Sequence, residues 1–212
     1  MSLDAAGNVL AWSAVGLQLS AYAIYVRRAL HSKVRPNTAS WLIWAYGGLL
    51  ETTSYVVMSE DWTKSLLPVA CNLASLATFA MLLGKGKFER ISLWEWGCVV
   101  IDVSAMLVWW CWHSATWAHL VTQASIPVSF APILIAVWRG QTGERLLPWA
   151  LWSVSYALGA AVVVLRWEQW PEIVFSAGNC LCHAMVGVLC VRTFRERWKR
   201  TGLTDGPEKD HA

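Results

Sequence analysis

Seven apolar stretches, each about as long as a membrane-spanning helix, divide almost the whole chain. They are residues 9–26, 39–58, 66–84, 92–112, 117–138, 146–165 and 173–191. A helix needs about 20 mostly apolar residues to cross the hydrocarbon core of a bilayer. Charged residues make up only 15% of the chain, whereas about a quarter of the residues in a soluble domain are charged. We therefore predict an all-α membrane protein with seven transmembrane helices.

The lysines and arginines gather on one side of the predicted spans. Of the 17 basic residues, all except Lys64 and Arg166 fall in the first, third or fifth loop or after the seventh span. The positive-inside rule then predicts an N-terminus outside and a C-terminus in the cytoplasm, in a plasma (inner) membrane. The net charge of +3 gives no reason to expect a nucleic-acid partner. We expect the basic tail to lie near anionic membrane lipid.

Two distant segments begin with the same pattern of residues. RPNTASWLIWA (35–45) and RLLPWALWS (145–153) each place a basic residue and a proline before Trp-x-x-Trp. Aligning them pairs Trp41 with Trp149, Trp44 with Trp152 and, after a one-residue slip, Asn72 with Asn179. Residues 9–84 and 117–191 therefore resemble two copies of a three-helix unit, and such a repeat sets the architecture.

Two copies of a three-helix unit can both begin outside only if one further helix crosses the membrane between them. The stretch at 92–112 supplies that crossing. We therefore predict a 3+1+3 arrangement of two parallel triple-helix bundles. The predicted parts are a first bundle at 1–84, a linker helix at 85–116, a second bundle at 117–191 and a basic cytoplasmic tail at 192–212.

This plan resembles the SWEET, SemiSWEET and PQ-loop transporter superfamily, in which parallel repeats are joined by a linker helix. The resemblance implies a solute site between the bundles, with a facing asparagine pair on the third helix of each; Asn72 and Asn179 stand at those positions. It also implies hinge or gating prolines near the cytoplasmic helix ends, which Pro36, Pro132 and Pro148 would supply.

The sequence departs from this superfamily in two respects. The PQ dipeptide is absent, because Ile133 follows Pro132. Sugar carriers of the superfamily place an aromatic residue on the second helix of each bundle; the first copy offers Tyr55, whereas the second has valines at 162–164. The PnuC vitamin transporters share the seven-helix plan, but their acid- and asparagine-rich last helices are not seen in this chain.

Buried amides suit a transport site. Each offers two donors and an acceptor oxygen without a charge to desolvate, so Asn72 and Asn179 could exchange water for the polar groups of a solute. The alternative is an interhelical hydrogen bond that holds the bundles together. His183 lies one turn after Asn179 and is a further candidate for solute binding, with a hydrogen-bonded core histidine as the alternative.

Glu51 and Asp102 are the acidic residues deepest in the predicted spans. A carboxylate near the bilayer centre costs about 2.5–3.5 kcal/mol on insertion scales and is a functional candidate by default. We predict that Glu51 and Asp102 are candidates for proton coupling; the alternative is a neutral acid bonded to a neighbouring helix. Gly159 stands where the second copy would carry the counterpart of Glu51, which suggests open space there.

Tryptophan and cysteine are abundant in the chain. The 16 tryptophans are predicted to lie near the two membrane faces, where aromatic belts anchor helices; an aromatic ligand cage is the alternative for one or two. The six cysteines fall inside the predicted spans and are interpreted as core thiols. Cys180 and Cys182 would point about 200° apart on a helix, so we expect no metal site.

The sequence therefore predicts a transporter for a small polar metabolite, such as a sugar, an amino acid or a vitamin, working by alternating access and open to proton coupling. The alternative is a seven-helix membrane receptor or assembly factor of the same fold, which binds a ligand without moving it. No Ser–His–acid set or glycine-rich phosphate loop lies at a useful depth, so we expect neither enzymatic activity nor a cofactor. Pairing of two copies as a homodimer is left open.

Overall fold

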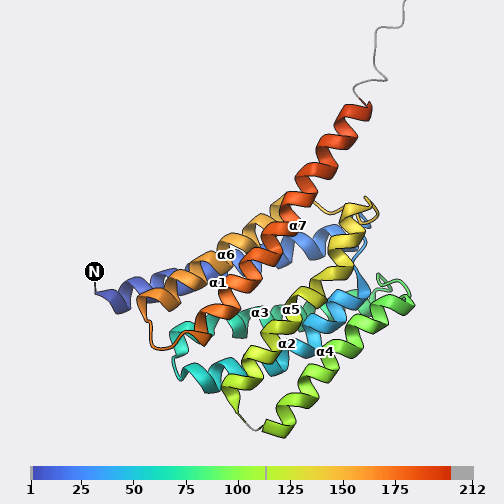
Figure 1. The fold of residues 1–212 in the computed structure, drawn as a ribbon. Coiled ribbons are helices and arrows are strands. Elements are labelled where there is room, and N and C mark those ends of the chain that lie inside the picture. The colour runs from blue at the N-terminus through green and yellow to red at the C-terminus, as the bar shows by residue number, and fades with distance from the viewer. Residues whose placement is uncertain (1, 113, 202–212) are drawn as a thin grey trace, which may run out of the picture.

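Seven α-helices make up nearly all of the computed structural model (Figure 1). It describes residues 2–112 and 114–201, without the side chains at 102, 105, 106, 108–112 and 197–201. The helices are α1 (Leu3–Leu30), α2 (Thr38–Ser59), α3 (Trp62–Gly84), α4 (Leu93–Trp112), α5 (Ala115–Trp138), α6 (Leu146–Leu165) and α7 (Pro171–Thr201). The prediction of an all-helical chain with one helix at each apolar stretch is confirmed, and no strand occurs within the described residues.

Five of these helices, α1, α3, α5, α6 and α7, are long and apolar enough to cross a membrane. The length and composition of these helices are consistent with a membrane protein. The other two have comparable lengths, 22 residues in α2 and 20 in α4. The polar residues of α2, Glu51 among them, lower its mean hydropathy, and several side chains of α4 lie outside the described part. Membrane crossing by α2 and α4 stays a prediction.

Polar side chains mark where helices begin. Asn37 precedes α2 and accepts a hydrogen bond from the backbone N–H of Ser40 at 3.0 Å. Asp61 precedes α3 and accepts from the N–H of Thr63 at 2.8 Å. Such caps satisfy backbone donors that the first helical turn leaves unpaired. The connection between α2 and α3 is only two residues long, at 60–61. The two helices are therefore antiparallel neighbours.

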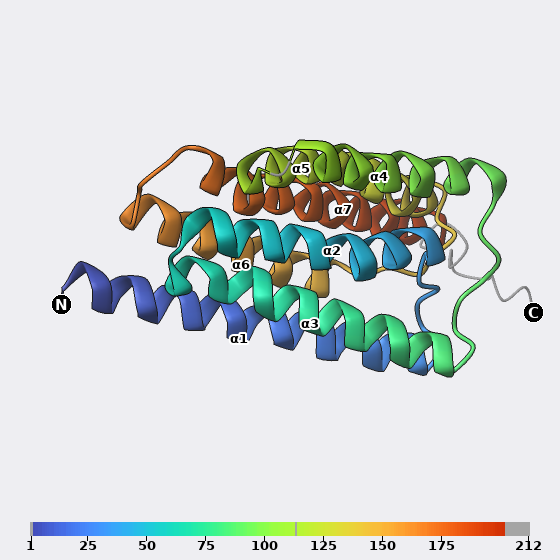
Figure 2. The same ribbon diagram turned by 90° about the horizontal axis from the view of Figure 1, so that it is seen from below.

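The helix neighbours follow a repeated order. In the first half of the chain α3 packs against both α1 and α2, and in the second half α7 packs against both α5 and α6. Across the two halves, α1 packs against α6 and α2 packs against α5. Helix α4 lies on one side, against α5 and α2 (Figures 1 and 2). The six helices other than α4 thus surround the centre of the molecule.

The loops divide between two ends of the helical bundle. We call one the basic end: it holds the connections at 31–37, 85–92 and 139–145. We call the other the N-terminal end: it holds residue 2 and the connections at 60–61 and 166–170. Figure 2 shows the N-terminus at one end of the bundle and the connection between α3 and α4 at the other.

Helix α7 continues past residue 191, where the second bundle was predicted to end, and reaches Thr201. It projects beyond the other helices (Figure 1). Arg192 stabilises this extension, because its guanidinium carbon lies 3.5 Å from the ring centre of Trp138 and its Nε donates to Glu196 one turn later at 2.8 Å. The first part of the predicted tail is therefore helical, and 202–212 lie outside the described residues.

Candidate functional site

A cavity of about 40 Å³ lies in the middle of the bundle and is lined by all helices except α4. A cavity needs about 10–15 Å³ of such volume for each water, so this one has room for about three. Lining residues recur at helical spacing, as Trp44, Gly48 and Glu51 do on α2. Residues three and four apart share one helix face, so the site is built from inward faces rather than from loops.

The two asparagines predicted to bind solute both line this cavity. Asn72 is buried and its Oδ1 has no hydrogen-bond partner among the described residues. Asn179 is also buried, and its Nδ2 donates to the carbonyl oxygen of Phe175 at 3.0 Å. Leaving a buried acceptor unpaired costs about 1–3 kcal/mol. The Asn72 oxygen is therefore available to a donor group of a molecule that enters the cavity.

Gly48 lets Asn72 approach α2 closely. A Cβ atom added at Gly48 would lie 3.0 Å from Asn72 Oδ1, which is closer than the usual van der Waals contact of about 3.5–4.0 Å between heavy atoms. Gly48 and Asn72 both line the cavity. The absence of a side chain at residue 48 thus sets the position of the amide that faces the cavity.

Glu51 also lines the cavity, and it is not an isolated acid. Its Oε1 accepts a hydrogen bond from Nε2 of Gln123, so the contact joins α2 to α5. The space expected at Gly159 is absent. A Cβ atom at Gly159 would lie 2.5 Å from Leu67 Cδ2 and 3.0 Å from Ser176 Oγ. Glycine is needed there because α6 packs tightly on α3 and α7.

The remaining predicted site residues fall in different surroundings. His183 lines the cavity, and its Nδ1 donates to the carbonyl oxygen of Asn179 at 2.8 Å. Tyr55 packs instead against two other rings: its ring centre lies 5.4 Å from that of His119 and 5.6 Å from that of Phe175. A role of Tyr55 in solute binding stays a prediction. The side chain of Asp102 lies outside the described residues.

The three prolines predicted as hinges lie at or near the basic end of the helices. Pro36 precedes the cap of α2, Pro148 lies in the first turn of α6, and Pro132 lies inside α5. Pro127 of α5 and Pro68 of α3 are further prolines within helices, and Pro68 lines the cavity. A proline inside a helix removes one backbone hydrogen bond; whether any of the three acts as a hinge stays a prediction.

The four tryptophans of the repeated pattern do not anchor the protein at the membrane surface. Trp41, Trp149 and Trp152 are buried, and Trp44 is half-buried. They contact one another: ring centres lie 5.3 Å apart for Trp41 and Trp44, and 5.0 Å apart for Trp149 and Trp152. The prediction of aromatic belts is therefore wrong for these four, although it fits the exposed Trp12, Trp62, Trp94, Trp96, Trp117, Trp138, Trp167 and Trp170.

Ion pairs tie the helices together at the N-terminal end. Lys64 Nζ, on α3, lies 2.8 Å from Glu172 Oε1 and 3.0 Å from Glu168 Oε2. Arg166 donates through Nε to Asp61 Oδ2 at 2.7 Å and through Nη1 to Asp4. Burial alone would raise the pKa of Asp61, but the Arg166 guanidinium and backbone N–H donors lower it below its usual value.

Hydrogen bonds tie α1 to the connection between α5 and α6 at the basic end. Tyr25 donates to Glu144 Oε1 at 3.1 Å, and Trp149 Nε1 donates to Glu144 Oε2 at 2.9 Å. Arg28 Nη2 donates to the carbonyl oxygen of Gly143 at 3.4 Å. Burial raises the pKa of Glu144 to about 7, although the Trp149 and Tyr25 donors favour its charged form.

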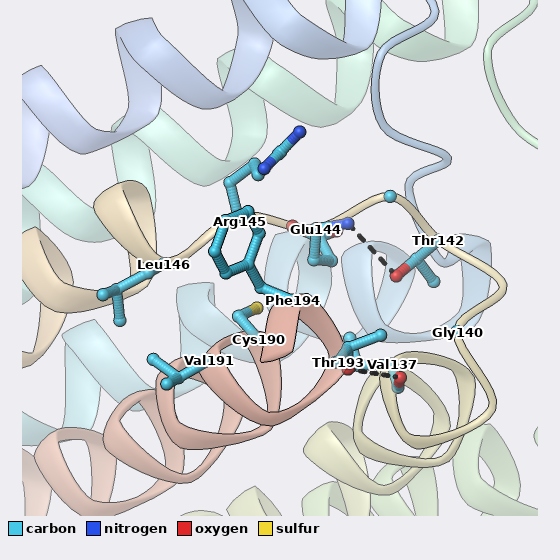
Figure 3. A pocket seen from close by; sticks show the side chains of 11 residues that line it. Val137, Gly140, Thr142, Glu144, Arg145, Leu146, Cys190, Val191, Thr193 and Phe194 are labelled. Atoms are coloured by element: carbon cyan, nitrogen blue, oxygen red, sulfur yellow. Dashed lines mark hydrogen bonds between the residues drawn. The ribbon is translucent and has the colours of Figure 1, made fainter. Parts of the chain in front are cut away.

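A larger pocket, of about 470 Å³, lies at the basic end between this connection and α7 (Figure 3). The Arg145 guanidinium carbon lies 5.9 Å from the ring centre of Phe194 across it. Glu144 and Cys190 also line it. Neither asparagine lines this pocket, so it is separate from the central cavity.

Comparison of the chain with protein-family models, curated proteins and solved structures found no match. The central cavity must therefore be interpreted from its own residues.

Sequence reasoning missed two residues that line the cavity and two that bond to its lining. Gln123, which bonds Glu51, and Gln18, whose Nε2 donates to Tyr156 at 3.3 Å, are buried amides on α5 and α1. Both stand out in the sequence as polar residues inside apolar stretches. Tyr22 and Tyr156 line the cavity, but nothing in their local sequence distinguishes them from membrane-anchoring aromatics.

Proposed function

We propose that this chain is a membrane transporter that moves a small polar metabolite by alternating access, with the central cavity as its solute site. One observation carries the proposal: Asn72 and Asn179, matched residues of two sequence copies, both line one cavity, in which the Asn72 oxygen has no partner among the described residues. A binding site at the interface of two repeats is the usual design of transporters built by duplication.

The helix neighbours support the proposed 3+1+3 plan and its resemblance to the SWEET and PQ-loop superfamily. In each proposed bundle the third helix packs against the first two, and the contacts between bundles pair α1 with α6 and α2 with α5. This pattern is the one expected if residues 1–84 and 117–191 are related by a two-fold repeat. Helix α4 lies outside both bundles, as a linker would.

Contacts at both ends support alternating access. The ion pairs of Lys64 and Arg166 join the proposed bundles at the N-terminal end, and the bonds to Glu144 join them at the basic end. Release of one set while the other holds would open the cavity to one side. The positions of the lysines and arginines support a basic end in the cytoplasm, hence an inner-membrane protein with its N-terminus outside.

Counterflow in proteoliposomes tests the proposal. Vesicles loaded with an unlabelled solute are expected to accumulate the labelled form only when they contain the protein, across a panel of sugars, amino acids, small amines and vitamins. Asn72→Ala and Asn179→Ala should each abolish this exchange, because each removes an amide that lines the cavity. Asn8→Ala is the matched control, because Asn8 is exposed at the N-terminal end.

Normal exchange by both cavity variants would contradict the proposed site. A solute that binds the purified protein but never exchanges across the vesicle membrane would favour the alternative, a receptor or assembly factor of the same fold.

A further inference from the structure

We infer that the central cavity selects a small organic cation, an ammonium that also carries a hydroxyl group, over neutral or anionic solutes of the same size. This inference rests on the proposed function, because it names the solute class of the proposed site. It follows from the aromatic rings, the single carboxylate, the unpaired polar atoms and the size of the cavity.

Six aromatic side chains form a closed circuit around the cavity. Successive ring centres lie 4.9–6.1 Å apart, and the residues come from five helices. In order they are Tyr22, Trp41, Trp44, Phe130, His183 and Trp152, and all six line the cavity. A cation within about 6 Å of an aromatic ring centre is attracted to the negative face of the ring, and sites for ammonium ligands use several such rings.

Trp149 supports this circuit without lining the cavity. Its ring centre lies 5.0 Å from that of Trp152, 5.6 Å from that of His183 and 6.5 Å from that of Phe130. It is fully buried. The rings that face the cavity are thus held by a further ring behind them, so their arrangement is fixed before any solute arrives.

The charge of the lining favours a cation. Glu51 is the one carboxylic acid among the lining residues, and no lysine or arginine lines the cavity within the described part of the chain. Gln123 Nε2 donates to Glu51 Oε1, which holds the carboxyl group in place across α2 and α5. Glu51 is half-buried, and a carboxylate in the lining of a protein cavity attracts a cation more strongly than it would in bulk water, because the effective dielectric constant is lower there.

Two unpaired atoms specify what else the solute carries. Asn72 Oδ1, an acceptor, and Trp152 Nε1, a donor, are both buried without a partner among the described residues, and both residues line the cavity. An ammonium can supply the N–H donor that Asn72 lacks, and a hydroxyl oxygen can accept from Trp152. A cavity with room for about three waters fits a solute of the size of ethanolamine.

Competition for binding of radiolabelled ethanolamine to the purified full-length chain tests the inference. Ethylene glycol and glycolate have nearly the same size as ethanolamine, but are neutral and anionic. We expect unlabelled ethanolamine to compete at least tenfold better than either. Equal competition by ethylene glycol or glycolate, or no saturable ethanolamine binding, would overturn the inference; neither result depends on a variant.

Two variants connect the selectivity to the cavity. Glu51→Gln is expected to weaken ethanolamine binding at least tenfold, while the matched control Glu60→Gln, at an exposed residue at the N-terminal end, leaves it unchanged. Unchanged binding by Glu51→Gln would place the cation elsewhere and overturn the inference. Sugar counterflow without ethanolamine binding would retain the proposed transport function and exclude a cationic solute. Ethanolamine binding without exchange of any solute would retain the cation site and contradict the proposed transport function.

Discussion

Lys64 Nζ lies 2.8 Å from Glu172 Oε1, and neither side chain is exposed. Among the lysines and arginines whose side chains the structure describes, Lys64 is one of two that fall outside the basic end, and the other, Arg166, lies 2.7 Å from Asp61. Both exceptions to the charge asymmetry are therefore neutralised by acidic partners. The pair also joins α3 to α7, so it connects the two proposed bundles at the N-terminal end.

Lys64→Met should destabilise the protein, because it leaves the carboxylate of Glu172 buried without a charged partner. Loss of one member of a buried pair typically costs about 3–5 kcal/mol. The double variant Lys64→Met/Glu172→Leu should recover most of the stability, since it removes the orphaned charge. Melting temperatures in detergent measure both effects. A single variant as stable as the wild type would show that the pair is not a buried ion pair.

Gly48→Ala should impair solute binding more than folding. The added methyl group would lie 3.0 Å from Asn72 Oδ1 and push this amide away from its position in the cavity. Gly16→Ala is the matched control, because no atom of the described residues lies within 4 Å of a Cβ at that helical glycine. We expect Gly16→Ala to keep full solute exchange and to gain up to about 1 kcal/mol of stability from helix propensity. Equal exchange by both variants would contradict a role for the Asn72 position.

The pKa of Glu144 predicts how stability varies with pH. Burial raises this pKa from 4.5 to about 7 in the folded protein, so the folded state holds a proton that the unfolded state releases. The contribution of Glu144 to the free energy of unfolding is therefore fully present below pH 4.5, and it is lost as the pH rises through 7. Glu144→Gln mimics the neutral acid, so its melting temperature should exceed that of the wild type at pH 8 and match it at pH 4.5. A difference in melting temperature that stays constant from pH 4.5 to pH 8 would contradict the raised pKa of Glu144. Glu60→Gln serves as the control.

Glu51→Gln tests proton coupling. A glutamine at this position keeps an oxygen that can accept from Gln123 but has no exchangeable acidic proton. At solute concentrations high enough to offset its weaker binding, we expect the variant to fold and to take up solute without a response to an imposed pH gradient across liposomes. If wild type and variant respond equally to the gradient, Glu51 is not the coupling group. If the wild type ignores the gradient, the protein is a facilitator.

Much of the fold is predictable from the sequence because long apolar stretches have few stable alternatives to helices in a membrane. The ends of all seven helices were predicted to within six residues, apart from the extension of α7 to Thr201. The extension was missed because its charged residues interrupt the apolar pattern. The contact of Arg192 with Trp138, which stabilises it, joins two helices and is not visible in the local sequence.

The candidate site was only partly predictable. The repeat identified Asn72 and Asn179, and depth in the span identified Glu51. The neighbours of these residues in space could not be predicted from the sequence. Gly159, for example, was expected to leave open space, yet the side chains of Leu67 and Ser176 fill it. Trp41 and Trp149 were interpreted as membrane anchors because composition does not distinguish a tryptophan that faces lipid from one that faces another helix.

The accessibility of Cys71 tests alternating access most directly. This native thiol lines the cavity and lies 3.0 Å from Tyr156 Oη. A variant that keeps Cys71 and replaces the other five cysteines by alanine would be treated with a membrane-impermeant methanethiosulfonate in right-side-out and inside-out vesicles, with Cys71→Ala in the same background as the control. We predict labelling of Cys71 from both sides, slowed in each case by a transported solute. Labelling from one side only, or from neither, would contradict a cavity that opens alternately to the two sides of the membrane.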